Sequence, residues 1–266
     1  AFARIGSSGY SAQIGSSGSS ARIGSSGAFA RIGSSGDYAQ IGSSGDFARI
    51  GSSGDYAQIG SSGGSAQIEV AGNKSVAAAI GYKAIAKGCK GTWITLAEYD
   101  RSGKVVFVKT EQIDGERLKE NIFYTLYNKT FHEVEIIDGM STIILKRKNN
   151  VIKGVNLSGY SACYVFQKDG INAHGLTARQ AYIDWLFKTS DRDVSKYQNI
   201  SENETHPLEW WVVAYRTITG ACSFGTNDYL EHNKDKYKPE MTLSEVIKAT
   251  DGQYGSQTFK EFFERS

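Results

Sequence analysis

Two residues of this sequence could form a nucleophile and its base, although they lie far apart in the chain. Cys222 would be the nucleophile and His174 the base, with Asp191 or Asp193 orienting the imidazole ring. A thiol becomes a good nucleophile when a neighbouring base removes its proton. However, a cysteine that follows Thr-Gly-Ala at the end of a helix is more often a small buried residue. We therefore expect a non-enzymatic protein, with the Cys222–His174 pair as the enzymatic alternative.

The remaining histidines and cysteines match no metal or disulfide pattern. The other histidines, which lack the spacing of metal ligands, are His132, His206 and His232. The cysteines are widely separated and odd in number, which fits neither a zinc motif nor a disulfide framework and favours a reducing compartment; they are Cys89, Cys163 and Cys222. No glycine loop has the lysine and the following helix that phosphate binding needs. We expect no cofactor and no metal.

Two arginines and a tryptophan in the last third of the chain are candidate binding residues. Arg192 lies beside Asp193 and close to Tyr197, and Arg216 lies in a later segment of the chain. A guanidinium group can fix helix packing through an ion pair, which is the interpretation we favour, or it can bind an anion or a nucleic acid. Trp210 precedes Trp211 on an expected helix, so the two rings must point in different directions. An exposed tryptophan is typical of interfaces, but we favour packing for Trp210.

The first third of the chain is a nine-residue repeat that returns eight times. In each unit an alanine and an isoleucine share one parity, as Ala39 and Ile41 do, which predicts a strand with these residues facing a narrow interior. We expect Gly-Ser-Ser-Gly to turn the chain, with glycine supplying a positive φ. A fixed short period predicts a β-solenoid, with either two or three strands in each coil.

Two other structures have similar composition or period. A Gly/Ser-rich segment can be a disordered linker, but a linker has no need of a regular Ala-x-Ile pattern. Calcium-binding rolls also have nine-residue repeats, with aspartate in a glycine-rich turn. Here only some repeats contain aspartate, namely Asp37, Asp46 and Asp55. We predict no calcium.

Stacked repeats would align their outward residues into ladders. The ladder residues that we select as candidate binding residues are Phe29, Arg31, Tyr38, Phe47, Arg49 and Tyr56. Guanidinium groups beside aromatic rings suit nucleic acids, glycans or a protein surface. The alternative is that the ladders only stabilise the coils.

The rest of the chain changes from β to α patterns. The repeat decays through irregular coils, and a segment of antiparallel β character follows from Thr92 to Val155, with a first hairpin turn at Arg101-Ser102-Gly103. In this segment the basic run Lys146–Lys148 is expected to be a solvated edge strand. Helices are then expected after Thr177, after Pro207, after Thr242 and from Thr258 to Glu264. The expected inner face of the first helix is Ala178, Ala181, Tyr182, Trp185 and Leu186.

These patterns predict a mainly β fold in three segments. Residues 1–88 are expected to form a β-solenoid, residues 89–158 an antiparallel β region that caps it, and residues 159–266 a β-hairpin with an α-rich C-terminal module. The chain has a formal net charge of +2, which is too balanced to indicate a nucleic-acid-binding protein from bulk charge. No apolar run is long enough to span a bilayer, so we expect no membrane partner.

Motifs throughout the chain resemble uncharacterised phage and prophage proteins with Ile-Gly-Ser-Ser-Gly repeats. The motifs after the repeats are Lys90-Gly91-x-Trp93-Ile94-x-Leu96-Ala97-Glu98, Ala173-His174-Gly175-x-Thr177, Asp191-Arg192-Asp193, Tyr215-Arg216-x-Ile218-Thr219-Gly220-Ala221-Cys222 and Gly252-Gln253-Tyr254-Gly255. The resemblance implies a phage accessory protein in the cytoplasm of a host bacterium, and it implies no established activity or site residues.

The function expected from these observations is binding. We expect a phage-encoded interaction protein that binds and inhibits a host factor, a protein or a protein–nucleic acid complex, in counter-defence of the anti-CRISPR type. One alternative is a virion-associated or adhesive stalk that binds glycans, with oligomers in either case open. The other alternative is the Cys–His enzyme.

Overall fold

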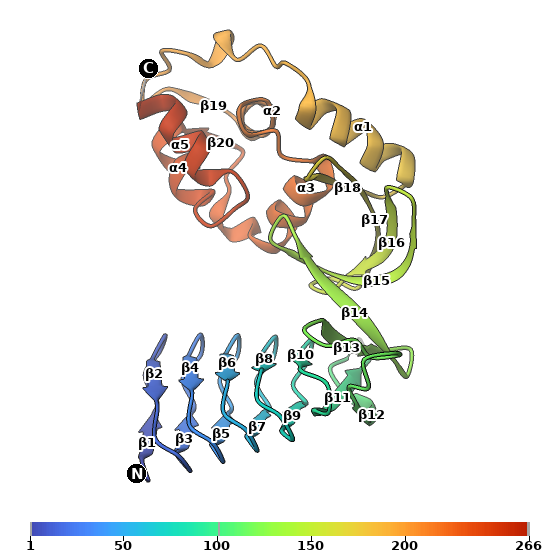
Figure 1. Ribbon diagram of the computed structural model, residues 1–266. Helices are drawn as coiled ribbons and strands as arrows, with labels where there is room; N and C mark the ends of the chain where they lie inside the picture. The colour runs from blue at the N-terminus through green and yellow to red at the C-terminus, as the bar shows by residue number, and fades with distance from the viewer. Residues whose placement is uncertain (1, 101, 265–266) are drawn as a thin grey trace. The chain divides into compact units, whose positions relative to one another are not determined.

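The computed structural model describes residues 2–100 and 102–264, and it divides into two compact units (Figure 1). Unit 1 is Ala1–Glu135 and unit 2 is Ile136–Ser266. The change of unit falls inside strand β14 (Thr130–Ile137). The three segments expected from the sequence are a finer division that these two units do not test. The fold is mainly β, as predicted.

The repeats of unit 1 form a β-solenoid with two strands in each coil, so the two-strand alternative is the one found. Parallel pairing joins each strand to the strand two repeats later, as in Arg22↔Gln40 and Ile23↔Ile41. One sheet contains β1 (Arg4–Ser7), β3 (Arg22–Ser25), β5 (Gln40–Ser43), β7 (Gln58–Ser61), β9 (Val76–Ala79) and β11 (Trp93–Tyr99); the other contains β2 (Gln13–Ser16), β4 (Arg31–Ser34), β6 (Arg49–Ser52), β8 (Gln67–Val70) and β10 (Ile85–Gly88).

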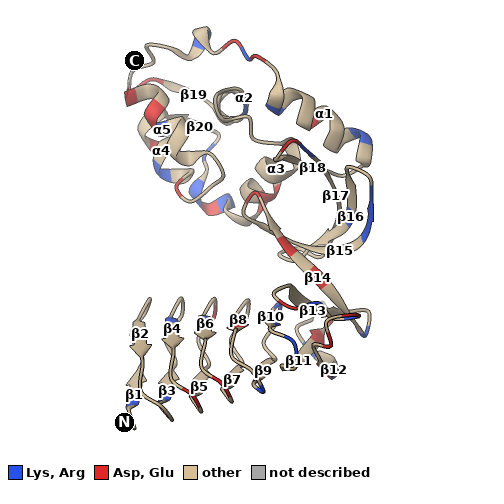
Figure 2. Ribbon diagram, in the orientation of Figure 1, with Lys and Arg blue, Asp and Glu red and all other residues tan. Residues whose placement is uncertain are grey.

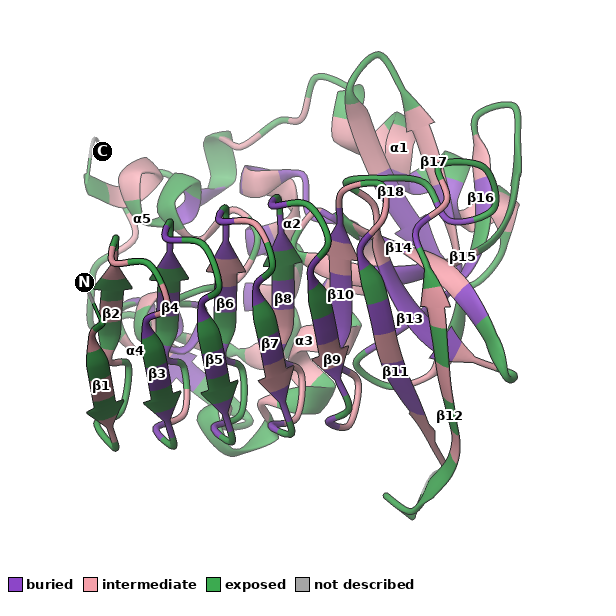
Figure 3. Cartoon of the chain, turned by 60° about the horizontal axis from the view of Figure 1, so that its bottom comes forward, coloured by how far each residue is buried: buried purple, intermediate pink, exposed green. Residues whose placement is uncertain are grey.

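The interior of the solenoid is narrow and built from three residues of each repeat. Ala39 is 0% exposed and Ile41 is 4% exposed, which confirms the predicted inward parity. The first serine of each turn also faces inward, as Ser43 does. Successive side chains of a strand point to opposite faces, so the residues between them, such as Gln40, lie outside (Figure 3).

The turns differ from the expectation that glycine would supply the positive φ. No glycine of the repeats has a positive φ, and the left-handed position is instead the residue two places before each strand. These residues are Ser11, Ser20, Phe29, Tyr38, Phe47, Tyr56, Ser65, Lys74 and Lys83, with φ between 53° and 59°. From Ser11 to Ser65 the backbone N–H groups of these residues donate to a carbonyl of the next coil, as Tyr38 does to Asp55 at 2.8 Å. This pairing between coils holds them in a conformation that non-glycine residues seldom adopt.

Glycine is needed in the turns for close approach rather than for φ. A Cβ atom on Gly36 would lie 2.2 Å from the carbonyl oxygen of Gly18 in the neighbouring coil. The other glycine of the same repeat, Gly33, points outward and has open space at its Cβ position. The two glycines of the repeat therefore have different roles, and only the second one is sterically required.

The aspartates of the turns bind backbone of the next coil. Asp46 accepts a hydrogen bond from the N–H of Gly64 at 2.6 Å, and Asp55 accepts one from Asn73 at 2.7 Å. Asp37 accepts one from Asp55 at 2.9 Å. These carboxylates therefore stabilise the stacking of coils, which accounts for their presence without calcium.

Antiparallel strands cover the last coils of the solenoid. Strand β12 (Val105–Gln112) pairs with β11, and β13 (Phe123–Tyr127) pairs with β10 and with β14. Ser102 and Gly103 form part of the β11–β12 turn as predicted, whereas Arg101 lies outside the described residues. The edges of the last two parallel strands are thereby paired, as an open solenoid end requires.

Unit 2 combines an antiparallel sheet with five helices among its described residues. The strands are β15 (Met140–Lys148), β16 (Val151–Asn156), β17 (Ser161–Lys168) and β18 (Ile171–Gly175), with a short pair β19 (Thr205–Pro207) and β20 (Glu240–Thr242). The helices are α1 (Ala178–Thr189), α2 (Leu208–Thr219), α3 (Ser223–His232), α4 (Leu243–Ala249) and α5 (Ser256–Glu264).

The predicted helix starts are confirmed, but the inner face of α1 is not as predicted. Thr177 caps α1, and Thr242 and Glu245 form a capping box on α4. On α1 the buried residues are Ala181 and Asp184, while Tyr182 and Leu186 are exposed. The apolar pattern predicted the wrong face because Asp184 of α1 pairs with Arg216 of α2, as described below. Helix α3 was missed, since its sequence contains glycine and asparagine and has weak helix propensity.

Candidate functional site

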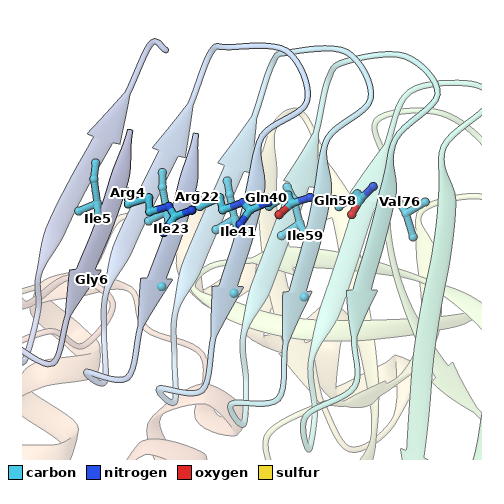
Figure 4. Close-up of a pocket in the computed structure, with 13 residues that line it drawn as sticks. Arg4, Ile5, Gly6, Arg22, Ile23, Gln40, Ile41, Gln58, Ile59 and Val76 are labelled. Carbon is cyan, nitrogen blue, oxygen red and sulfur yellow. The ribbon is translucent and has the colours of Figure 1, made fainter. Parts of the chain in front are cut away.

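The outer face of each solenoid sheet carries a ladder of arginine and glutamine. On the sheet of β1 the row reads Arg4, Arg22, Gln40, Gln58 and Val76 (Figure 4), and on the sheet of β2 it reads Gln13, Arg31, Arg49 and Gln67. Backbone pairing holds these side chains in register from coil to coil. Each sheet therefore presents a row of guanidinium and amide groups along most of its length.

A row of glycines runs beside each ladder and makes the faces shallow grooves. On the sheet of β1 the groove has a volume of about 860 Å³ and includes Gly6, Gly24, Gly42 and Gly60. The groove on the other sheet has a volume of about 690 Å³. Because glycine has no side chain, a ligand could reach the strand backbone beside the arginine and glutamine groups.

The predicted candidates Phe29, Arg31, Phe47 and Arg49 form one surface, which we call the Phe–Arg surface. The rings of Phe29 and Phe47 stack with centroids 4.9 Å apart and planes 8° from parallel. They are 44% and 51% exposed, and they line one groove with the two arginines. Within residues 2–100 and 102–264, no ion pair involves Arg31 or Arg49. The surface therefore combines exposed aromatic area with uncompensated positive charge.

The candidates Tyr38 and Tyr56 lie on the opposite edge of the solenoid, beside glutamines. Their rings stack with centroids 4.9 Å apart, and the neighbouring ladder residues are Gln40 and Gln58. The Nζ atom of Lys74 donates to the hydroxyl oxygen of Tyr56 at 3.0 Å. We call this second, polar surface the Tyr–Gln surface. The structure thus separates the aromatic candidates into two chemically different groups.

The left-handed conformation of the aromatic residues is costly. A non-glycine residue in this conformation costs about 1–2 kcal/mol, and aromatic stacking returns about 0.5–1.5 kcal/mol. Serine occupies the same position in other repeats, at Ser11, Ser20 and Ser65. An exposed phenylalanine is therefore not required by the turn, which has the same positive φ whether the residue is serine, lysine or aromatic.

Arg192 and Arg216 have structural partners in unit 2. Arg192 donates through Nε to the carbonyl oxygen of Thr217 at 2.8 Å and through Nη1 to that of Lys188 at 2.6 Å, so it joins the C-terminal ends of α1 and α2. Arg216 forms an ion pair with Asp184, with Nη2 and Oδ1 2.9 Å apart. The partner is Asp184 rather than Asp193, which accepts from the N–H of Ser195.

Asp184 explains why α1 turns a polar residue inward. Besides Arg216, its Oδ2 accepts from the N–H of Ser223 at 3.3 Å and from the amide of Gln180 at 3.3 Å. A buried carboxylate is tolerated when it is paired and hydrogen-bonded in this way. The sequence places Asp184 among the apolar residues of α1. The hydrophobic pattern alone does not show that this aspartate is buried.

Trp210 packs within unit 2, as favoured from the sequence. Its ring stacks on His206 with centroids 3.8 Å apart, and it meets the ring of Tyr197 edge to face at 5.3 Å. Trp211 is buried and donates through Nε1 to the carbonyl oxygen of Met241 at 2.7 Å. These contacts account for both tryptophans.

The Cys222–His174 pair does not have the geometry of a nucleophile and its base. Cys222 caps α3, where its Sγ atom accepts from the N–H of Gly225 at 3.3 Å, and burial raises the pKa of its thiol. The His174 ring is fully buried, neither ring nitrogen has a hydrogen-bond partner in the described chain, and burial lowers its pKa to about 4. Asp191 and Asp193 therefore do not orient this ring.

Two searches of the described residues, for clustered metal ligands and for membrane-spanning helices, found neither. Across residues 2–100 and 102–264, no group of three or more His, Cys, Asp or Glu residues is arranged to hold a metal ion. No helix in the same part of the chain is both long and apolar enough to cross a bilayer.

Comparisons with protein-family models, with curated proteins and with solved structures found no match to this chain.

Proposed function

We propose that this protein is a non-enzymatic binding protein that holds a host macromolecule on the Phe–Arg surface of its solenoid. The observation that supports this proposal is the exposed Phe29–Phe47 stack beside Arg31 and Arg49. Aromatic residues and arginine contribute most of the binding energy at many interfaces. An acidic surface with apolar residues, on a host protein or a protein–nucleic acid complex, has the complementary chemistry.

The biological role that we propose comes from the resemblance to phage and prophage proteins. In that context the protein acts in the cytoplasm of a host bacterium and blocks a defence factor, in the manner of an anti-CRISPR protein. A rigid ladder is well suited to blocking, because it loses little conformational freedom on binding. No catalytic step is required.

The repeats themselves supply variants that test this proposal without disturbing the fold. Glutamine stands at the arginine position in other repeats, and serine stands at the phenylalanine position. We would compare the Arg31→Gln/Arg49→Gln variant with the Arg4→Gln/Arg22→Gln variant, which removes the same charge from the other sheet. A second pair is Phe29→Ser/Phe47→Ser and Tyr38→Ser/Tyr56→Ser.

Two measurements apply to these variants. The first is affinity capture from a lysate of the bacterial host, and the second is plating of a CRISPR-targeted phage on cells that express each variant. We expect both Phe–Arg variants to lose the captured partner and the protection of the phage, while their matched controls retain both. Equal loss in the controls, or no effect in any variant, would contradict the proposal.

A second candidate function is glycan binding by a virion-associated or adhesive stalk, and the Tyr–Gln surface favours it. Stacked tyrosine rings beside glutamine amides offer apolar faces and neutral hydrogen-bonding groups. A glycan array would test this candidate. Retention that the Tyr38→Ser/Tyr56→Ser variant loses would favour the stalk over the inhibitor, and an array without signal would dismiss it.

A further inference from the structure

A basic segment of unit 2 has no counterpart in the proposed function. From Ser141 to Lys168 the sequence contains five basic residues and no acidic residue. The basic residues are Lys146, Arg147, Lys148, Lys153 and Lys168. The whole chain is nearly neutral, so bulk charge hides this local excess. Figure 2 shows basic residues on this part of unit 2.

Strand pairing places three of the lysines and two aromatic rings on one face of the sheet. Lys146 of β15 is opposite Lys153 of β16, which is opposite Tyr164 of β17. In the second row Lys148 of β15 is opposite Val151 of β16, which is opposite Phe166 of β17. Residues directly opposite each other in antiparallel strands share a face. The two rows line a groove of about 530 Å³.

The other face of these strands belongs to the core of unit 2. Ile152 and Val165 are fully buried and pack with Ile137. Helix α1 covers the far end of the lysine-bearing face, because a Cβ on Gly175, opposite Tyr164, would lie 2.4 Å from the backbone nitrogen of Ala181. The helix stops short of the lysines, so that end of the face is left open.

The three lysines are exposed and are not neutralised by acidic neighbours. In the described part of the chain no ion pair involves Lys146, Lys148 or Lys153. Tyr164 and Phe166 are half-buried, and the Phe166 ring also contacts the ring of Tyr182 at 5.1 Å. The basic run was expected to be a solvated edge strand, and its lysines are solvated, but β15 is not an edge strand because it lies between β14 and β16 in the sheet.

We propose that this face of the β15–β17 sheet binds single-stranded nucleic acid. Bases would stack on Tyr164 and Phe166, and the phosphates would lie near Lys146, Lys148 and Lys153. Lysine-lined grooves with aromatic platforms on a sheet bind single strands in this way, with little sequence preference. The site lies in a different unit from the Phe–Arg surface and does not depend on it.

The spacing on the sheet fits this ligand better than an acidic peptide. The two rings stand two residues apart on β17, about 7 Å along the strand, and the lysines of β15 have the same separation. The rings of β17 and the lysines of β15 are two strand spacings apart, about 10 Å. A single strand has a row of bases and a parallel row of phosphates, whereas an acidic peptide would need the lysines but not the paired rings.

The test is fluorescence anisotropy of the whole chain with a labelled oligothymidylate of about 15 nucleotides, over a range of salt concentrations. The charge variant is Lys146→Gln/Lys148→Gln/Lys153→Gln. Its matched control is Lys234→Gln/Lys238→Gln/Lys260→Gln, which removes the same charge from exposed lysines elsewhere in unit 2. The ring variant is Tyr164→Leu, which keeps an apolar residue on β17. Far-ultraviolet circular dichroism verifies that each variant is folded.

We expect the charge variant to bind at least ten-fold more weakly and the control to bind like the unmodified protein. Each lost phosphate contact should reduce the slope of log K against log salt by about 0.7, so the charge variant should lose about 2 from this slope. Tyr164→Leu should weaken binding several-fold with an unchanged slope. Three results would overturn the proposal: no binding at low salt, equal weakening by the control, or equally tight binding of oligoglutamate that Tyr164→Leu does not affect.

Discussion

The two glycines of each repeat allow a strict test of how the coils stack. In one repeat we would replace Gly36 by alanine, and in a second protein we would replace Gly33 by alanine. Both changes add one methyl group to the same Ile-Gly-Ser-Ser-Gly unit. Only at Gly36 does that methyl group meet the neighbouring coil, because its Cβ would lie 2.2 Å from the oxygen of Gly18.

The size of the effect follows from the distances. Cβ atoms essentially never come closer than 3.0 Å to such an oxygen, so the coils must separate by at least 0.8 Å. The adjacent bond from the N–H of Ser35 to Ser16 is 2.9 Å long and would then exceed hydrogen-bond length. The lost backbone hydrogen bond and the overpacking together cost about 2–4 kcal/mol. Gly33→Ala should change stability by at most about 1 kcal/mol, in the stabilising direction.

The assay is chemical unfolding followed by circular dichroism, with the free energy of unfolding compared among the three proteins. The sequence already contains a natural version of the experiment. The position of Gly33 is taken by Glu69, Ala78 and Lys87 in later coils, whereas the position of Gly36 remains glycine through Gly81. If Gly36→Ala proved as stable as Gly33→Ala, the spacing of the coils would be adjustable and close approach would not explain the glycine.

Three further predictions concern buried residues, namely Ile41 and Ser43 in unit 1 and His174 in unit 2. Ile41→Ala should cost about 2–5 kcal/mol by leaving a cavity, whereas Gln40→Ala on the outer face should cost less than about 0.5 kcal/mol in thermal unfolding. Ser43→Ala should leave the melting temperature unchanged or raise it, because the buried Oγ has no partner among the described residues and Val70 and Ala79 fill the same position in later coils; a clear loss of stability would show that the hydroxyl is bound. The unfolded chain takes up a proton at His174 near pH 6.5 but the folded chain only near pH 4, so stability should fall by about 3 kcal/mol as the pH drops between these values. Denaturant titrations at several pH values should show this fall, and His174→Leu should remove it.

The solenoid was predictable because its repeat determines both the strand parity and the stacking. Ala39 and Ile41 are inside because their parity is regular over eight units. The number of strands in each coil was left open, although a signal for it was present. Tyrosine precedes glutamine and phenylalanine precedes arginine in alternate repeats, as in Tyr38-Ala39-Gln40 and Phe47-Ala48-Arg49. Over the four repeats from Phe29 to Gln58 this alternation indicates a coil of two strands, since like residues then stack on like.

What sequence reasoning could not predict depends on contacts between distant segments. The positive φ of Phe29 and Tyr38 results from hydrogen bonds to the next coil, not from local preference, and glycine was therefore the wrong residue to expect there. Asp184 faces inward because Arg216, from a helix that begins more than twenty residues later, pairs with it. A pattern within one segment contains no information about such a partner.

The same reasoning separates the candidate residues that are free to bind from those that are not. Arg192, Arg216 and Trp210 were selected from their motifs and from the Trp210–Trp211 pair, and their hydrogen bonds and ring contacts lie within unit 2. Arg31 and Arg49 are exposed beside the Phe29–Phe47 stack, and other repeats have glutamine and serine at the corresponding positions. These residues are not required at their positions by the repeat, and they expose aromatic area and positive charge, so we assign the proposed partner to them rather than to Arg192, Arg216 or Trp210.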